Sequence, residues 1–305
     1  MTAHDPARRH LLAFLATSAL YFAFPARTWA SHVDRPGADL ATLEQARGGR
    51  LGVHVLDTAD PQASFGHRSD ERFGLCSTFK LLLAGMVLQE ADAGRLALDR
   101  PVRFSEADLV PYAPVIEQHL AAGQLSVGEL ARAAQTSSDN VAANLLLREL
   151  GGPEAFTQRL REWGDPVSRL DRIEPALNLV PPGELRDTSS PRAMALSVAK
   201  LVAGPLLGEA SRGLLKQWLI ATDTGLSRLR AGFPPHWVAG DKTGTGLHPS
   251  MPNRHNDVAV IWPQDGAPIV VAAFYEADAH YPSPRSEDNA ILAEVGQIVA
   301  GHLDG

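Results

Sequence analysis

Hydrophobic residues are spaced in two different ways along this chain, and the spacing predicts where its sheet and its helices lie. Near the N-terminus, residues 37–46 have the spacing of an amphipathic helix, and residues 50–56 alternate between apolar and polar positions as a strand does. Residues 62–67 are the expected hairpin partner of that strand. Three more strands and a closing helix are predicted near the C-terminus, at residues 237–242, 257–262, 269–275 and 286–302. The two ends of the chain are therefore expected to share one antiparallel sheet.

The middle of the chain has helical spacing and few strand signals. Six helices are predicted there, at residues 79–90, 127–134, 140–150, 153–163, 191–202 and 208–219. The first is apolar on nearly every side, which indicates a helix buried in the centre of a domain. Residues 165–190 contain four prolines and little periodicity, so they predict a long loop of the kind that is usually functional or disordered.

These elements predict an α/β (α+β) fold in which an antiparallel five-stranded sheet flanked by helices carries an inserted all-α domain. In this prediction, residues 31–68 and 220–305 form the α/β domain, and residues 69–219 form the all-α domain. The cleft between the two domains is the expected place for a functional site.

Residues 1–30 have the features of a signal peptide. Arg8 and Arg9 precede an apolar run that ends at Phe24, and Thr28-Trp29-Ala30 supplies small residues for cleavage. The adjacent arginines leave open whether export follows the twin-arginine or the general route. A membrane anchor is disfavoured, because the run is shorter than the roughly 20 residues that span a bilayer. The mature protein is expected to be periplasmic, with no stable membrane anchor.

Composition excludes several classes of function. The formal net charge is -7 and no basic stripe occurs, which argues against a nucleic-acid partner. The eleven histidines include no His-x-His pair, so neither a metal site nor another cofactor is expected. Cys76 is the single cysteine, so no intramolecular disulfide can form, and it is interpreted as a small buried hydrophobic residue rather than a nucleophile.

Four polar motifs occur in a fixed order along the chain: Ser77-Thr78-Phe79-Lys80, Ser138-Asp139-Asn140, Glu174 to Asn178, and Lys242-Thr243-Gly244. Together they offer the hydroxyl nucleophile, the base, the proton relay and the cation that covalent hydrolysis of an amide needs. A single S-x-x-K pattern is a weak signal, because Ser197-Val198-Ala199-Lys200 matches it too. That second copy lies in an apolar helical run without partner motifs and is interpreted as structural.

The first motif is predicted to place its serine and its lysine on one helix face. Ser77 is expected to open the buried helix, where unpaired amides favour an oxyanion; a helix-capping serine is the alternative. Lys80 follows three residues later and, in an apolar helix, needs a polar partner. It is expected to accept or relay the serine proton. Glu174 alone would be interpreted as a solvated loop residue, but beside the other motifs it is a candidate deacylating carboxylate.

The ordered motifs resemble the class A serine β-lactamases over nearly the whole chain after about residue 40. The resemblance implies hydrolysis of the β-lactam amide bond of penicillin- and cephalosporin-type antibiotics through an acyl-enzyme on Ser77, giving antibiotic resistance. It implies that Ser138 passes a proton to the leaving nitrogen, and that Glu174 and Asn178 position and deprotonate the water that attacks the acyl-enzyme. Either Lys80 or Glu174 removes the proton from Ser77.

The resemblance also implies which residues bind the substrate. These are Asn140, Asn178, Lys242, Thr243, Gly244, Thr245, Tyr112 and Arg228. The side chains of Lys242, Thr243 and Thr245 are expected to hold the substrate carboxylate, and the backbone amides of Ser77 and Thr245 to form the oxyanion hole. Asn140 is expected to contact the amide of the substrate side chain.

Four further expectations concern the rim and the loop. Arg228 is either an extra carboxylate anchor or an ordinary surface arginine, and Tyr112 is either an aromatic wall at the cleft entrance or a packing residue. By the resemblance, Arg172 and Asp187 pair across the neck of the loop, and the Glu174-Pro175 peptide is cis.

Two other functions share part of the pattern. A D-alanyl-D-alanine peptidase or penicillin-binding protein has the first, second and last motifs but lacks the Glu-x-x-x-Asn station. A penicillin-sensing binding domain would stay acylated and would usually need a membrane tether or a signalling domain. The motif from Glu174 to Asn178 favours the β-lactamase, with a small-molecule β-lactam as its partner and a monomer as its expected state.

Overall fold

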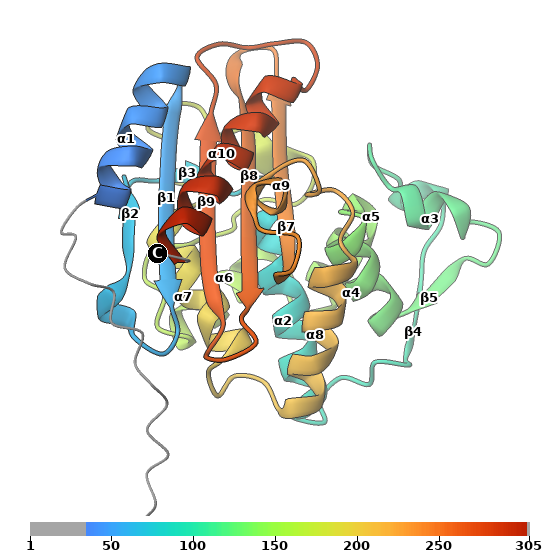
Figure 1. Cartoon of the computed structure of the whole chain (residues 1–305). Coiled ribbons are helices and arrows are strands. Elements are labelled where there is room, and N and C mark those ends of the chain that lie inside the picture. Colours follow the sequence, from blue (N-terminus) through green and yellow to red (C-terminus); the bar gives the residue numbers. More distant parts are fainter. Residues whose placement is uncertain (1–34, 304–305) are drawn as a thin grey trace, which may run out of the picture.

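A computed structural model of the chain describes residues 35–303, and a five-stranded antiparallel sheet runs through its centre (Figure 1). The strand order is β2-β1-β9-β8-β7, so both ends of the chain contribute to one sheet, as the hydrophobic spacing predicted. The bounds of these strands are β1 Arg50–Asp57, β2 Phe65–His67, β7 Val238–His248, β8 Met251–Trp262 and β9 Ile269–Glu276. Strand β7 is an edge strand.

Helices cover both faces of the sheet. Helices α1, α9 and α10 lie on the face that is in front in Figure 1, and the others lie behind the sheet or beyond β7. Their bounds are α1 Arg35–Arg47, α2 Phe79–Asp92, α3 Pro114–Gln118, α4 Val127–Thr136, α5 Asn140–Glu149, α6 Gly152–Glu162, α7 Pro191–Val202, α8 Glu209–Ala221, α9 Leu229–Gly232 and α10 Ser286–Leu303. Two short strand pairs complete the fold: β3 Phe73–Gly74 with β6 Thr188–Ser189, and β4 Pro101–Arg103 with β5 Gln124–Ser126.

The alternation of side chains along the strands builds two separate apolar cores. On β9, Val270 and Phe274 pack with α2 and α7, whereas Val271 and Tyr275 pack with α1 and α10. Helix α2 is buried along most of its length within the first core. A helix enclosed in this way has no polar face, which explains its uniformly apolar sequence.

The structure corrects two predicted strands. Strand β7 continues to His248, and β8 begins at Met251 rather than at residue 257. The start of β8 was missed because its residues are polar but buried: the side chain of Arg254 bonds Glu276, and that of Asn256 donates to the Gly74 carbonyl. Hydrophobic spacing does not detect buried polar residues that have partners.

A second correction concerns the hairpin partner of β1. Only residues 65–67 pair with β1, because residues 61–63 form a 3₁₀ turn that the Asp60 side chain caps. Helices α3 and α9 were also absent from the prediction. Both are five residues long or shorter, and segments of that length carry too few apolar positions to show a period.

A buried histidine on β1 predicts how stability depends on pH. His54 is 2% exposed, and burial lowers its pKa to about 4. The unfolded chain protonates histidine near pH 6.5, so stability is expected to fall as the pH drops from about 6.5 to about 4, by about 3 kcal/mol from this residue. Urea unfolding should show a smaller decline over this range for His54→Gln than for the unaltered chain. Equal declines would contradict the prediction.

The predicted signal peptide, residues 1–30, lies outside the described residues. Within residues 35–303, no helix combines the length and the apolar character that crossing a bilayer requires.

Candidate active site

Ser77 lies one turn before the central helix rather than at its first residue. It is the middle residue of a 3₁₀ turn, Cys76–Thr78, which leads directly into α2. Its hydroxyl donates to Oε1 of Glu174 at 3.2 Å and caps no helix. The alternative interpretation of Ser77 as a capping serine is therefore wrong.

Glu174 is the residue on which three of the polar groups converge. Its side chain is almost fully buried, and Oε1 lies 3.1 Å from Nζ of Lys80 as well as 3.2 Å from the Ser77 hydroxyl. The other carboxylate oxygen, Oε2, accepts a hydrogen bond from Nδ2 of Asn178 at 2.7 Å. The loop therefore brings a carboxylate against the hydroxyl and the ammonium group of the first motif.

Lys80 links the first motif to the second. Its ammonium group is completely buried and donates to the Ser138 carbonyl at 2.9 Å and to Oδ1 of Asn140 at 2.5 Å. Burial lowers the pKa of Lys80, and the neighbouring Glu174 carboxylate acts in the opposite direction. The apolar helix thus contains a lysine because three oxygen acceptors meet its head group.

A second buried lysine approaches the same serine motif from the sheet. Nζ of Lys242 donates to Oγ of Ser138 at 3.0 Å and to the Thr243 carbonyl at 2.7 Å. Burial holds the pKa of Lys242 well below its usual range, and the positive charge of Lys80 lowers it further. Ser138 has a positive φ of 57°, a conformation that directs both its carbonyl and its hydroxyl to lysines.

Strand β7 passes directly beside the turn that carries Ser77. A Cβ atom on Gly244 would lie 3.1 Å from the Leu75 carbonyl oxygen and 3.2 Å from the backbone nitrogen of Ser77. Only glycine allows the strand to come this close without displacing the turn. Because β7 is an edge strand, the residues after Lys242 border the space in front of Ser77.

Arg228 lies behind this edge and is 5% exposed, so its interpretation as a surface arginine is wrong. Its Nη2 donates to the Thr245 hydroxyl at 2.6 Å, and its Nη1 donates to the carbonyls of Gly244 and Asn256. The guanidinium therefore carries a positive charge to the end of the K-T-G strand. Thr243 has a different partner, the Thr224 hydroxyl at 2.7 Å, which sequence reasoning did not identify.

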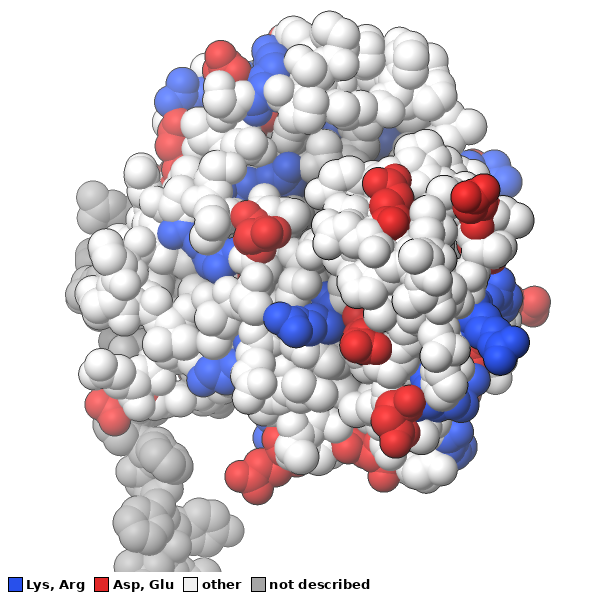
Figure 2. Space-filling model, turned by 90° about the vertical axis from the view of Figure 1, so that its right-hand side faces the viewer, with Lys and Arg blue, Asp and Glu red and all other residues white. Residues whose placement is uncertain are grey.

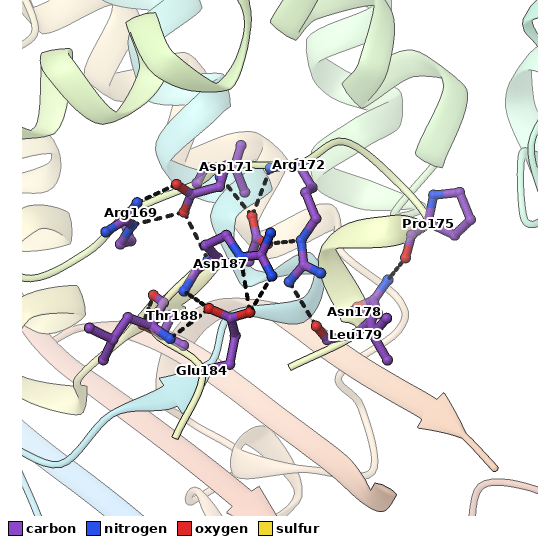
Figure 3. A network of polar contacts seen from close by, with 12 residues as sticks. Arg169, Asp171, Arg172, Pro175, Asn178, Leu179, Glu184, Asp187 and Thr188 are labelled. Atoms are coloured by element: carbon purple, nitrogen blue, oxygen red, sulfur yellow. Dashed lines mark hydrogen bonds and ion pairs between the residues drawn. The ribbon is translucent and has the colours of Figure 1, made fainter. Parts of the chain in front are cut away.

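An ion pair closes the neck of the loop formed by residues 165–190, called the Glu174 loop below. Nε of Arg172 donates to Oδ2 of Asp187 at 2.5 Å, and its Nη2 donates to the Leu179 carbonyl (Figure 3). Oδ1 of Asp187 accepts the backbone N–H groups of Asp171 and Arg172. The predicted pairing of Arg172 with Asp187 is present, and the Glu174-Pro175 peptide is cis, as expected.

Asn144 fixes the backbone of Glu174, and the sequence analysis missed it. Its Oδ1 accepts the Glu174 N–H at 2.9 Å, and its Nδ2 donates to the Glu174 carbonyl at 2.9 Å. Asn144 lies one helical turn after Asn140 on α5, so it shares the face that points to the site. That spacing is the signal that could have identified it.

The other predicted residues lie around this centre. Tyr112 is 58% exposed, so it does not act as a packing residue, and its carbonyl accepts the Asn140 N–H at 3.0 Å. Asp139 caps α5 and accepts two N–H groups of α3, which gives it a structural role. Cys76 is buried, and burial raises the pKa of its thiol to about 12, so it is not a nucleophile at neutral pH.

The second S-x-x-K copy makes only structural contacts. Ser197 donates to the Asp165 carboxylate, and Lys200 donates to the Trp163 carbonyl, both on α7 far from Ser77 in sequence. Among residues 35–303, no group of three or more histidine, cysteine, aspartate or glutamate side chains could hold a metal ion.

Comparisons with known proteins agree on one family. A family model described as "Beta-lactamase enzyme family" matches residues 35–303. β-Lactamase FAR-1 of Nocardia farcinica (strain IFM 10152) is 46% identical over 267 residues, which cover 87% of this chain and 82% of the relative. β-Lactamase OXY-2 of Klebsiella oxytoca is 41% identical over 292 residues, covering 96% and 97%.

The solved structures lead to the same family. An ancestral (GNCA) class A β-lactamase is similar with a TM-score of 0.82 and 49% identity, over 88% of this chain and 99% of that one. The chain therefore belongs to the class A serine β-lactamases and hydrolyses the amide bond of β-lactam antibiotics, an activity that gives resistance to them.

Proposed function

We propose that Ser77 is the nucleophile of this hydrolysis and that Glu174 serves both half-reactions. The observation that carries the proposal is the position of Glu174 Oε1, which is 3.2 Å from the Ser77 hydroxyl and 3.1 Å from the Lys80 ammonium group. In acylation, the Ser77 oxygen bonds the β-lactam carbonyl carbon as its proton passes to Glu174, its hydrogen-bond acceptor. Lys80 stabilises the carboxylate and orients Ser138 and Asn140.

The leaving nitrogen receives its proton from Ser138. Opening of the ring breaks the carbon–nitrogen bond, and the electron pair left on nitrogen takes the hydroxyl proton of Ser138. Lys242 supports this step because its Nζ touches that hydroxyl at 3.0 Å. Ser138 regains a proton when the one that Glu174 took from Ser77 is relayed through Lys80, which contacts both Glu174 and Ser138, and Glu174 is then a carboxylate again. The backbone N–H groups of Ser77 and Thr245 hold the carbonyl oxygen as its negative charge develops.

Deacylation requires a water molecule between Glu174 and the acyl-enzyme. Asn178 supports this role, because its Nδ2 holds the Glu174 carboxylate while its buried Oδ1 has no hydrogen-bond partner among the described residues. A buried acceptor of that kind is matched by a water hydrogen. Glu174 takes a proton from this water, whose oxygen bonds the acyl carbon. The bond between that carbon and the Ser77 oxygen then breaks, and the Ser77 oxygen receives the proton from Glu174, its neighbour at 3.2 Å.

The substrate is bound by groups on three sides of Ser77. Lys242, Thr243 and Thr245 hold the carboxylate of the antibiotic, and Arg228 adds charge through its bond to the Thr245 hydroxyl. Asn140 binds the side-chain amide, Gly244 leaves room for the ring, and exposed Tyr112 forms the opposite wall. Turnover of both a penicillin and a chromogenic cephalosporin by the purified mature chain tests this assignment, and a chain that is acylated but never turns over would contradict it.

Asn144→Ala is expected to slow turnover by roughly 10²-fold, because Glu174 would lose both backbone hydrogen bonds and its precise position. Stability should fall by about 1–3 kcal/mol. Thr157→Val is the matched control: Thr157 makes two hydrogen bonds to Leu170 at the start of the same loop, away from Glu174. Stopped-flow hydrolysis and urea unfolding should show a similar loss of stability in both variants and a large loss of kcat only in Asn144→Ala.

We also propose the organisation and location of the mature protein. Residues 31–68 and 220–305 form an α/β domain and residues 69–219 an all-α domain, with the site between them. The chain acts as a monomer in the periplasm after cleavage of residues 1–30. Mass spectrometry of the exported protein and its sedimentation behaviour test the cleavage site and the monomeric state.

A further inference from the structure

A cavity of about 430 Å³ lies beside the Glu174 loop, and its lining includes none of the residues assigned to catalysis or to substrate binding. Residues 180–185 of the loop form one wall, and the ends of β1, β8 and β9 form another. The loop wall is mostly apolar, with Val180, Pro181, Pro182 and Leu185, which is 52% exposed, and Glu184 is its one charged residue. A cavity of this size with an apolar wall accommodates a small organic molecule.

The wall formed by the sheet carries three charged side chains at paired positions on neighbouring strands. Arg50 on β1 and Arg254 on β8 both lie opposite Glu276 on the strand between them, β9. Oε2 of Glu276 accepts from Arg50 at 2.9 Å, and Oε1 accepts from Arg254 at 2.9 Å. Both oxygens of this carboxylate are therefore occupied by the two arginines beside it.

A third arginine in the cavity wall has no carboxylate partner. Arg72 donates from Nη1 to the Val167 carbonyl and to the Thr188 hydroxyl, each at 2.9 Å, and forms no ion pair within residues 35–303. Burial and the nearby charges of Arg169 and Arg161 lower the pKa of Arg72, and the Asp165 carboxylate acts in the opposite direction without forming an ion pair with it. The remaining acid of the wall, Glu184, is engaged by Arg186 and by two backbone N–H groups.

We propose that this cavity binds a small organic carboxylate, with its apolar part against the prolines and Leu185 and its carboxylate on Arg72. Arg50 and Arg254 lie in the same lining, but their charges are shared with Glu276, and that of Arg50 also with Glu71, so Arg72 is the residue that would hold the anion. A planar guanidinium that lacks an anion pairs well with a carboxylate through two parallel hydrogen bonds. The apolar loop wall favours an organic acid over an inorganic ion, because the body of the acid would be removed from water.

The ligand would adjoin the deacylation machinery without entering the cleft. Arg254, 4% exposed, donates to the carbonyls of Asn178 and Val180, and the Asn178 side chain holds Glu174. A carboxylate in the cavity would therefore lie against the arginine that supports the far side of the Glu174 loop. Its binding should not compete with the antibiotic for Ser77.

Benzoate is a suitable probe, and benzamide is its uncharged counterpart of nearly the same shape. Calorimetric titration of the purified enzyme at constant ionic strength should show one benzoate site, with benzamide binding at least about tenfold more weakly. Arg72→Gln should weaken benzoate binding by about tenfold or more. Arg72→Lys, which keeps the charge, should bind more tightly than Arg72→Gln. Arg103→Gln on β4, an exposed position outside the cavity, should match the unaltered enzyme.

Hydrolysis of a chromogenic cephalosporin by each variant shows that the protein is folded. The same assay with benzoate present shows whether benzoate competes for the catalytic cleft. Benzoate in the cavity should leave the KM for the cephalosporin unchanged. Equal affinities for benzoate and benzamide would overturn the proposal. The proposal would also be overturned if benzoate competed with the cephalosporin and if Arg72→Gln changed the affinity for benzoate by less than twofold. The probe would then occupy the catalytic cleft. If Arg72→Gln fails to fold, the lysine variant and the two probes provide the same test.

Discussion

Replacing Ser77 with alanine is expected to reduce β-lactam hydrolysis by on the order of 10⁴-fold or more, to a level near that of the buffer. Without the hydroxyl, Glu174 and Lys80 remain in place, but no bond to the carbonyl carbon can form. The fold should be unaffected, because the Ser77 side chain caps no helix and its hydrogen bond is to Glu174. Steady-state hydrolysis of a chromogenic cephalosporin measures the loss, and intact-protein mass should show no adduct at any time.

The chain contains its own control for this experiment. Ser197 begins the second S-x-x-K pattern, but its hydroxyl is buried and bonds Asp165. Ser197→Ala should retain kcat within about twofold while losing about 1 kcal/mol of stability from the missing hydrogen bond. Activity near normal in Ser77→Ala, or its loss in Ser197→Ala, would mean that the nucleophile has been misassigned.

Replacing Glu174 with alanine is expected to stall the reaction after acylation. Among residues 35–303, Glu174 is the one carboxylate that contacts both Ser77 and Asn178, so its removal should slow the attack of water by roughly 10²–10⁴-fold. Acylation should be less affected if Lys80 takes over the serine proton. Intact-protein mass after mixing with a penicillin should therefore show an accumulated adduct on Ser77 that disappears within seconds in the unaltered enzyme.

A second glutamate of the same loop distinguishes chemistry from loop stability. Glu184 bonds Arg186 and local backbone N–H groups and makes no contact with Ser77 or Lys80. Glu184→Gln should turn over normally and accumulate no adduct. Unchanged steady-state hydrolysis by Glu174→Ala would show that the attacking water is activated by another group.

The spacing of apolar residues along the sequence predicted most of the long helices. Helices α4, α5 and α7 were found to within a few residues, because each turns a regular set of apolar side chains to a core. Helix α2 was found because its sequence is apolar on nearly every side, as a fully enclosed helix requires. The start of β8 was missed because its buried residues are polar. Arg254 and Asn256 are buried there through partners that lie far away in the sequence, and local patterns contain no information about such partners.

The residues of the candidate site also fall into those that the sequence identified and those that it did not. Ser77, Lys80 and Glu174 were identified from short motifs, and the structure places Ser77 and Lys80 within hydrogen-bond distance of Glu174. Asn144 was not identified, since it acts on the backbone of Glu174 rather than on a reacting group. The burial of Arg228 also could not be read from its neighbours in sequence, because the carbonyls that receive it belong to β7 and β8.

The two buried lysines have a consequence for which forms of an antibiotic the cleft accepts. Of the groups that hydrogen-bond Lys80 and Lys242, only Glu174 carries a negative charge. Lys242 hydrogen-bonds only neutral oxygens, those of Ser138 and Thr243, and it is the residue that we propose to bind the acid of the antibiotic. A penicillin whose acid is masked as a neutral ester could not make that charged contact, so an esterified prodrug is expected to bind more weakly than the free drug before any bond is broken.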